Sequence, residues 1–341
     1  MDGVRGGGRT SAALTLLIGA LACASDSGDA GATTGPPSNS TGSQSSETSA
    51  APTTVADDTA SAPLDACDRE APRSGDQVIE VEHGGQMRSY RLFVPESYQH
   101  GERTALVINF HGTGSTAAAQ ADVSQMREAA QDVGILVAFP QGLPLSGSGN
   151  VFNAGHRDFS EEPRDDVDFT RAVIDDVDKR ACLARDRVYA TGMSNGARMS
   201  HRLACEGADF IAAVGPVAGS LSLDPSACTP SRAISVMAFH GTQDGISPFE
   251  GTNLSTLNVE DTWALWADLN ECPSDPVVSY QTTEVLCETY SGCAQGTEVT
   301  LCRIIEGGHC WPGNPLCVFG LSTVEIDASV ALLSFFAGFS L

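Results

Sequence analysis

The chain has 341 residues, with hydrophobic residues at 41% of positions and a formal net charge of −24 at pH 7. Lys179 is the only lysine, and so acidic a surface repels the phosphate backbone of nucleic acids and anionic membrane surfaces. The composition therefore argues against a nucleic-acid partner. The acidity is typical of a soluble or salt-adapted protein rather than of a site that selects charged substrates.

The N-terminal segment, residues 1–22, has the pattern of a signal peptide. Arg5 and Arg9 precede an apolar run that is too short to span a bilayer and ends in small residues. Residues 20–23 are similar to a bacterial lipoprotein cleavage site, in which Cys23 becomes the lipidated N-terminus. We therefore expect export, with Cys23 as the only membrane attachment. Cleavage as an ordinary signal peptide, which would release the protein, is the alternative.

Residues 23–66 consist almost wholly of Ser, Thr, Gly, Ala, Pro and Asp. Such a segment cannot bury enough apolar surface to offset chain entropy, so we predict a disordered linker. Residues 67–341 are enough for one large core, and we predict a single catalytic domain there.

Cysteine usage agrees with export. The chain has eleven cysteines, and ten remain when Cys23 is set aside as the lipidation site. An even number suits five disulfides outside the cytoplasm, with a pairing that sequence leaves open. Zinc binding is the competing use, but residues 287–317 contain no Cys-x-x-Cys pair, so we predict no metal site.

The predicted elements begin with two alternating segments, 77–82 and 88–94, which indicate an antiparallel hairpin at a sheet edge. Later runs rich in β-branched or aromatic residues are typical of strands buried on both faces of a parallel sheet. These runs are 105–110, 135–139, 187–191, 211–217, 234–239 and 299–305. Helical patterns separate most of them and close the chain, at 117–132, 166–179, 195–205, 257–270 and 327–336. The alternation predicts the α/β class, with a mostly parallel central sheet flanked by helices.

The run 187–191 leads directly into Gly192-Met193-Ser194-Asn195-Gly196 and then into a helical pattern. Strand, sharp turn and helix around Gly-x-Ser-x-Gly are the setting of a nucleophile elbow. The glycines are required because side chains beside the serine would strike the strand or the helix. The pattern predicts Ser194 as a nucleophile and the α/β-hydrolase fold.

A serine nucleophile needs a base and a carboxylate that orients the base. In α/β-hydrolases the order is Ser, acid, His, with the acid and the His on loops after late strands. Asp244 follows the run 234–239 and His309 follows the run 299–305, so we predict Ser194, Asp244 and His309 as the triad. The structural alternatives are an Asx turn at Asp244 and a loop histidine held near a disulfide at His309.

Acyl transfer also needs two amide donors for the developing oxyanion. The residue after the nucleophile, Asn195, supplies one, and the loop after an early strand supplies the other. We predict the amide of Thr113 for the second, since the glycines of residues 110–114 let backbone pass close to the ester.

Three other polar residues are assigned structural roles. His111 and His240 precede glycine at strand ends and do not fit the chain order of the triad, so we expect them to shape their loops. Asp166 opens a helix and is predicted to cap it. As the triad acid it would precede Ser194, which is the wrong order for this fold.

These motifs resemble those of the polyhydroxybutyrate depolymerase-like and feruloyl or acetylxylan esterase family. The similar stretches span nearly the whole catalytic region: 88–95, 110–112, 165–167, 187–196, 239–242 and 308–313. The resemblance implies a secreted α/β-hydrolase that cleaves polymer esters, with the triad Ser194, Asp244 and His309. For ester hydrolysis by such a triad we expect no cofactor. It also implies that Trp311 lies near the acyl or alcohol pocket.

The chain departs from that family in two loops. Residues 153–158 replace a Gly- and Cys-rich stretch and are expected to border the cleft. Cys310 stands where relatives often have Thr, so a disulfide there is expected to stiffen the histidine loop. We expect no separate polymer-binding module after Leu341, and this expectation weakens the case for an insoluble substrate.

The sequence thus favours an exported serine carboxylic ester hydrolase that acts through an acyl-serine intermediate. Its expected substrates are hydroxyalkanoate polyesters or oligomers, or feruloyl and acetyl esters of plant walls. A serine peptidase or an acyltransferase could use the same triad. A non-catalytic ligand-binding surface lipoprotein is the alternative from another class, and the presence of all three triad residues argues against it.

Overall fold

The computed structural model describes residues 70–155, 164–251 and 257–341. The predicted signal peptide, Cys23 and the linker at 23–66 lie outside the described residues. The described residues belong to one compact unit, Ser61–Leu341. Among the described helices, none is both long enough and apolar enough to cross a bilayer.

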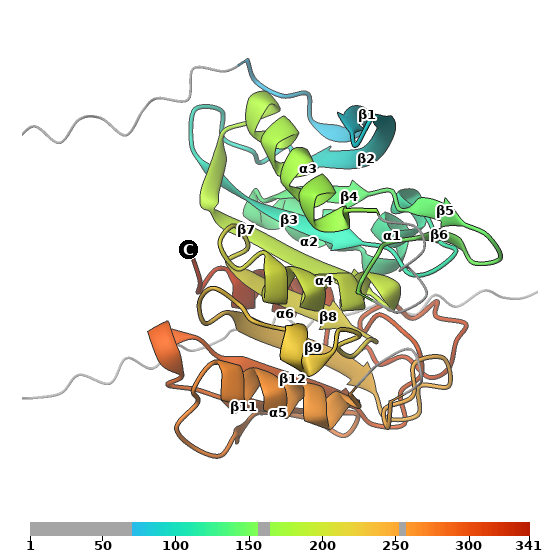
Figure 1. The fold of residues 1–341 in the computed structure, drawn as a ribbon, viewed down its shortest axis with the longest axis vertical. Coiled ribbons are helices and arrows are strands. Elements are labelled where there is room, and N and C mark those ends of the chain that lie inside the picture. Colours follow the sequence, from blue (N-terminus) through green and yellow to red (C-terminus); the bar gives the residue numbers. More distant parts are fainter. Residues whose placement is uncertain (1–69, 156–163, 252–256) are drawn as a thin grey trace, which may run out of the picture. The chain divides into compact units, whose positions relative to one another are not determined.

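Ten strands of the described chain form one sheet (Figure 1). They are β1 Gly75–His83, β2 Gln86–Val94, β3 Thr104–Phe110, β4 Leu136–Pro140, β7 Leu183–Met193, β8 Ala213–Val217, β9 Ser235–Gly241, β10 Val277–Gln281, β11 Val285–Tyr290 and β12 Val299–Ile304. Their spatial order is β1-β2-β4-β3-β7-β8-β9-β12-β11-β10. The six strands from β4 to β12 pair in parallel, whereas β1, β2, β10 and β11 are antiparallel. The predicted mostly parallel sheet with an edge hairpin is confirmed.

Helices cover both faces of the sheet. They are α1 Ala117–Ser124, α2 Met126–Val133, α3 Asp166–Arg180, α4 Asn195–Glu206, α5 Val259–Leu269 and α6 Ala328–Phe336. Figure 1 shows α3, α4 and α5 together on one side of the sheet, with α6 behind it. Strand β3 explains the two layers, because alternate side chains point to opposite faces. Leu106 and Ile108 join the core under α3, α4 and α5, while Val107 joins the core under α1, α2 and α6.

Four parts of the fold differ from expectation. Strand β11 was not predicted, although buried and half-buried residues alternate along it. The helix predicted at 117–132 is two helices, because Gln125 adopts a left-handed conformation (φ 50°) between α1 and α2. Strand β10 was missed since all five of its residues are exposed, which leaves no alternation to read. The hairpin of β5 (Leu143–Leu145) and β6 (Gly149–Val151) has strands too short for any periodicity.

Every cysteine in the described residues is disulfide-bonded. Four pairs are Cys205–Cys228, Cys272–Cys293, Cys287–Cys302 and Cys310–Cys317, and Cys182 is bonded as well. The expected use of cysteine in disulfides is therefore confirmed for this part of the chain. Such bonds form and persist in oxidising compartments.

Candidate active site

Ser194 lies in a sharp turn between β7 and α4. Its backbone has φ 59° and ψ −114°, a conformation that a residue with a Cβ rarely adopts. The turn is held by the Ser194 amide, which donates to the Val217 carbonyl at 2.9 Å. A Cβ on Gly196 would lie 2.1 Å from the Phe110 oxygen, and one on Gly192 would lie 2.5 Å from it. Both glycines are thus required by backbone packing, as the elbow pattern predicts.

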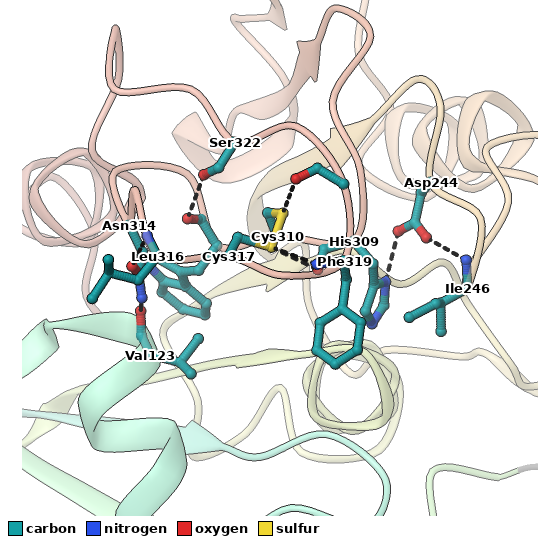
Figure 2. The surroundings of a disulfide bond; sticks show 12 residues. Val123, Asp244, Ile246, His309, Cys310, Asn314, Leu316, Cys317, Phe319 and Ser322 are labelled. Atoms are coloured by element: carbon teal, nitrogen blue, oxygen red, sulfur yellow. Dashed lines mark hydrogen bonds and ion pairs between the residues drawn. A yellow bond between two sulfur atoms is a disulfide. The ribbon is translucent and has the colours of Figure 1, made fainter.

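His309 and Asp244 form a buried pair on the loops that follow β12 and β9. The His309 Nδ1 donates to Asp244 Oδ2 at 2.7 Å (Figure 2). Asp244 Oδ1 accepts from the amides of Ile246 and Ser247 at 2.8 and 2.7 Å. Burial raises the pKa of Asp244, but the His309 hydrogen bond and charge together with these amides outweigh it, so the pKa is lowered. The carboxylate is therefore ionised at neutral pH and orients the imidazole.

Ser194 and His309 line one pocket of about 460 Å³. Its lining includes residues at or after the ends of β3, β7 and β12. Among the residues that the structure describes, its lining contains no Asp, Glu, Lys or Arg side chain, and most of the lining side chains are apolar. The lining residues are Gly112, Thr113, Gly114, Ser115, Gln120, Val123, Met193, Ser194, Ile246, His309, Trp311, Asn314, Leu316, Cys317, Val318 and Phe319. The pocket thus suits an uncharged ligand.

The loop after β3 runs directly past the serine. A Cβ on Gly112 would lie 3.3 Å from the Ser194 Cβ, so only glycine lets the backbone come this close without a shift. Within the described residues, the Thr113 amide has no hydrogen-bond acceptor and Thr113 lines the pocket. The Asn195 amide opens α4 and therefore has no acceptor within the helix. The Asn195 side chain bonds the backbone of Phe152: its Oδ1 accepts from the Phe152 amide at 2.8 Å, and its Nδ2 donates to the Phe152 carbonyl at 3.0 Å.

Most of the site residues predicted from sequence lie together. The pocket is lined by Ser194, His309, Thr113 and Trp311, and Asp244 lies behind His309. Trp311 is almost completely buried, and its Nε1 donates to Ser329 Oγ at 3.1 Å. Within the described part of the chain, no group of three or more His, Cys, Asp or Glu side chains could hold a metal ion.

His111 and His240 form hydrogen bonds within the two loops that border the candidate triad. His111 Nδ1 bonds the Gly112 carbonyl at 2.7 Å, and its Nε2 accepts from the Gly142 amide at 3.0 Å. His240 Nε2 donates to the Ser247 carbonyl at 2.7 Å and lies 3.6 Å from Asp244 Oδ2. Burial lowers the pKa of both, that of His240 to about 4, so both rings are neutral at pH 7. Both histidines therefore shape loops, as expected.

Asp166 does not cap α3, and this corrects the sequence interpretation. Asp165 is the cap, and its side chain accepts from the Asp168 amide at 2.8 Å. Asp166 is fully buried, contacts Arg88 Nη1 at 2.7 Å and accepts from the Asn153 amide at 2.6 Å. Its Arg88 partner lies 78 positions earlier in the chain, so no local pattern could have shown this pair.

We expect Asp166→Asn to cost stability more than rate. The change leaves the Arg88 charge buried without its partner, which costs roughly 3 kcal/mol in the free energy of unfolding. The matched control is Asp168→Asn on the same helix, whose carboxylate is 64% exposed and whose loss should cost below about 1 kcal/mol. Urea unfolding measures both values. Equal stability of the two variants would show that the buried pair contributes nothing.

The loop at 153–158 was expected to border the cleft. Its described residues, Asn153 to Gly155, do not line the pocket, and residues 156–158 lie outside the described chain. The wall of the pocket comes instead from residues 314–319, which sequence reasoning missed. The available signal was an apolar cluster, Leu316-Cys317-Val318-Phe319, in an otherwise turn-rich loop soon after His309.

No family model matches the chain. Over 228 residues it is 32% identical to feruloyl esterase B of Piromyces equi, an alignment that covers 63% of this chain and 41% of that protein. Over 290 residues it is 29% identical to NocK of Nocardia uniformis, a protein named as an esterase, covering 76% of this chain and 82% of that one. The chain thus spans less than half the length of the Piromyces enzyme.

Among solved structures, the acetyl xylan esterase of Aspergillus awamori matches with a TM-score of 0.56 at 15% identity, covering 76% of this chain and 99% of that one. The chain therefore has the α/β-hydrolase fold, which confirms the predicted fold class. By sequence it is a homologue of feruloyl esterases, and the enzyme class that these relatives support is that of the carboxylic ester hydrolases.

Proposed function

We propose that the chain is a serine carboxylic ester hydrolase with Ser194 as nucleophile, His309 as general base and Asp244 as the orienting acid. The observation that carries the proposal is that Ser194, in its strained turn, and His309, bonded to Asp244, line the same pocket, whose described lining has no charged side chain. Asp244 accepts a hydrogen bond from the Nδ1–H of His309, which keeps that proton on Nδ1 and leaves Nε2 as the ring nitrogen that can accept a proton.

The proposed reaction has two steps. In the first, His309 takes the proton of Ser194 Oγ as this oxygen attacks the ester carbonyl carbon. The amides of Thr113 and Asn195 are proposed to hold the oxyanion. His309 then gives the proton to the alcohol oxygen as the carbon–oxygen bond breaks, which leaves an acyl-serine. In the second step His309 deprotonates a water that attacks the acyl carbon, and the acid leaves as Ser194 Oγ recovers its proton.

The proposed substrates are feruloyl or acetyl esters of plant-wall polymers or their fragments. Their support is the similarity to feruloyl esterase B, together with a pocket that lacks charged side chains. Trp311, which lines this pocket, is the proposed substrate-contacting residue. The ester units within hydroxyalkanoate oligomers are uncharged too and fit the same pocket chemistry.

Export is part of the proposal. The disulfides of the described chain support an oxidising location, and the signal pattern at residues 1–22 supports secretion or attachment through lipidated Cys23. In either case the catalytic unit would work outside the cytoplasm.

A substrate panel tests the proposed function. The full chain is assayed on p-nitrophenyl acetate, methyl ferulate, acetylated xylan and soluble hydroxybutyrate oligomers, beside a Ser194→Ala control. We expect turnover of methyl ferulate or acetylated xylan that the control lacks. Preference for the oligomers would make the enzyme a polyester hydrolase. A folded chain that cleaves none of these esters would contradict the proposal and favour the transferase, peptidase or binding alternatives.

A further inference from the structure

Residues 316–319, Leu316-Cys317-Val318-Phe319, form a segment that we name the apolar strap. Leu316 is 82% exposed, Val318 81% and Phe319 56%, yet all three line the pocket that contains Ser194 and His309. Large apolar side chains that are exposed to water at the edge of a pocket are less favourable than buried ones, because their apolar surface stays hydrated. A ligand that covers them would bury that surface.

A disulfide and backbone hydrogen bonds connect the strap to the loop segment around His309, and Figure 2 shows the surroundings of this disulfide. The disulfide Cys310–Cys317 closes the loop, and the His309 amide donates to the Phe319 carbonyl at 3.0 Å. Beyond the strap, the Gly308 amide donates to the Leu321 carbonyl at 2.9 Å. The strap is thus tied to the backbone on both sides of the candidate base.

The start of the strap is tied to another part of the fold. Asn314 Nδ2 donates to the carbonyl of Val123, in α1, at 2.9 Å, and Asn314 Oδ1 accepts from the Leu316 amide at 2.9 Å. These bonds set the wall of the pocket between α1 and the histidine loop, with Leu316 and Val123 on the same side of the view in Figure 2.

Phe319 contacts the candidate base directly. Its ring lies edge-on to the His309 ring, with centroids 6.5 Å apart and planes inclined by 76°. Phe319 also lines the pocket that contains Ser194 and His309, so a substituent of an ester bound there can pack against this ring. An uncharged apolar substituent would bury Phe319 and Leu316, whereas a charged one would lose its water without gaining a partner.

We propose that the apolar strap is the specificity-determining wall of the site, and that the Cys310–Cys317 disulfide is the element that positions it. The wall binds an uncharged apolar group of the ester, on either its acyl or its alcohol side. This inference rests on the proposed ester hydrolysis and adds which part of the chain selects the substrate.

The first test replaces strap residues and measures selectivity. Phe319→Ala and Leu316→Ala are compared with Val324→Ala, a residue of the same loop that is 69% exposed and does not line the pocket. One series varies the acyl chain, as p-nitrophenyl hexanoate against acetate, and the other varies the alcohol, as hexyl against methyl acetate. We expect the strap variants to lower the long-to-short ratio of kcat/KM by about tenfold in one series, while Val324→Ala keeps the wild-type ratio.

The series that changes identifies the side of the ester that the strap binds. Either result supports the wall. Unchanged ratios in both series, in both strap variants, would overturn it.

The second test separates positioning from stability. The double variant Cys310→Ser, Cys317→Ser is compared with Cys272→Ser, Cys293→Ser, a pair outside the pocket lining. The control opens a 21-residue separation against 7, so it should lower Tm more. We nevertheless expect the Cys310 and Cys317 variant alone to lose the long-to-short selectivity. Loss that follows Tm in both variants would mean that the disulfide is merely structural.

Failure of this inference and failure of the proposed function give different results. A wild-type chain without any Ser194-dependent ester turnover removes the proposed function itself. Ester turnover that depends on Ser194 but ignores every strap change leaves the proposed function intact and removes only the strap as its selector.

Discussion

Ser194→Ala is expected to lower kcat on p-nitrophenyl acetate by about a million-fold, because Ser194 is the proposed nucleophile and alanine cannot form the acyl intermediate. The fold should survive, since the Ser194 amide and not its side chain bonds the Val217 carbonyl. Single-turnover assays on purified variant, with circular dichroism as the folding control, measure both effects. Hydrolysis retained near the wild-type rate would remove Ser194 from the mechanism.

A second variant at the same position uses the backbone strain. Ser194→Gly should be as inactive as Ser194→Ala, but more stable by about 1 kcal/mol, because glycine adopts a φ of 59° without steric cost. Thermal unfolding of the two variants measures the difference. Equal stability would show that the turn stores no strain.

Asp244→Asn is expected to lower kcat by about ten-thousand-fold with little change in KM. The amide nitrogen of asparagine can donate where the carboxylate accepts, so His309 would hold its proton on the wrong ring nitrogen. Steady-state kinetics measure the loss, and Asp268→Asn, which removes an exposed carboxylate of α5, is the matched control. A loss below tenfold would assign the orienting role to another group.

The same variant should change how stability depends on pH. The pKa of Asp244 is lowered in the folded chain, so the carboxylate contributes stability that is present above its ordinary value of 3.8. That contribution is lost as the pH falls through the lowered folded value. Wild type should therefore lose stability in acid more steeply than Asp244→Asn does. Parallel stability curves for the two proteins below pH 4 would contradict this.

Local patterns in the sequence were enough for the parallel strands, for the first hairpin and for the elbow. Strands such as β4 and β8 are buried along their whole length, so they appear as unbroken apolar runs. Gly192 and Gly196 are readable because a single backbone turn requires them. The position of β10 was not readable, since an edge strand exposed on both faces has no apolar side to mark it.

The candidate site was predictable as far as chain order and strand ends place it. The carboxyl ends of parallel strands meet at one edge of a sheet, so residues after β7, β9 and β12 had to gather there. That rule brings Ser194, Asp244 and His309 to the same edge. It says nothing of how the loops between strands fold back over the edge.

The sequence alone therefore determined the fold class, the nucleophile turn and the order of the three candidate triad residues, because each depends on spacing within one element or on strand order. Only the tertiary structure decided the partner of Asp166 and the apolar wall beside His309. Arg88 comes from β2 and meets Asp166 across the core, while the strap is held by a disulfide and by α1. Such contacts join segments that are far apart in the chain. The periodicity of apolar residues reports only local secondary structure, so it could not predict them.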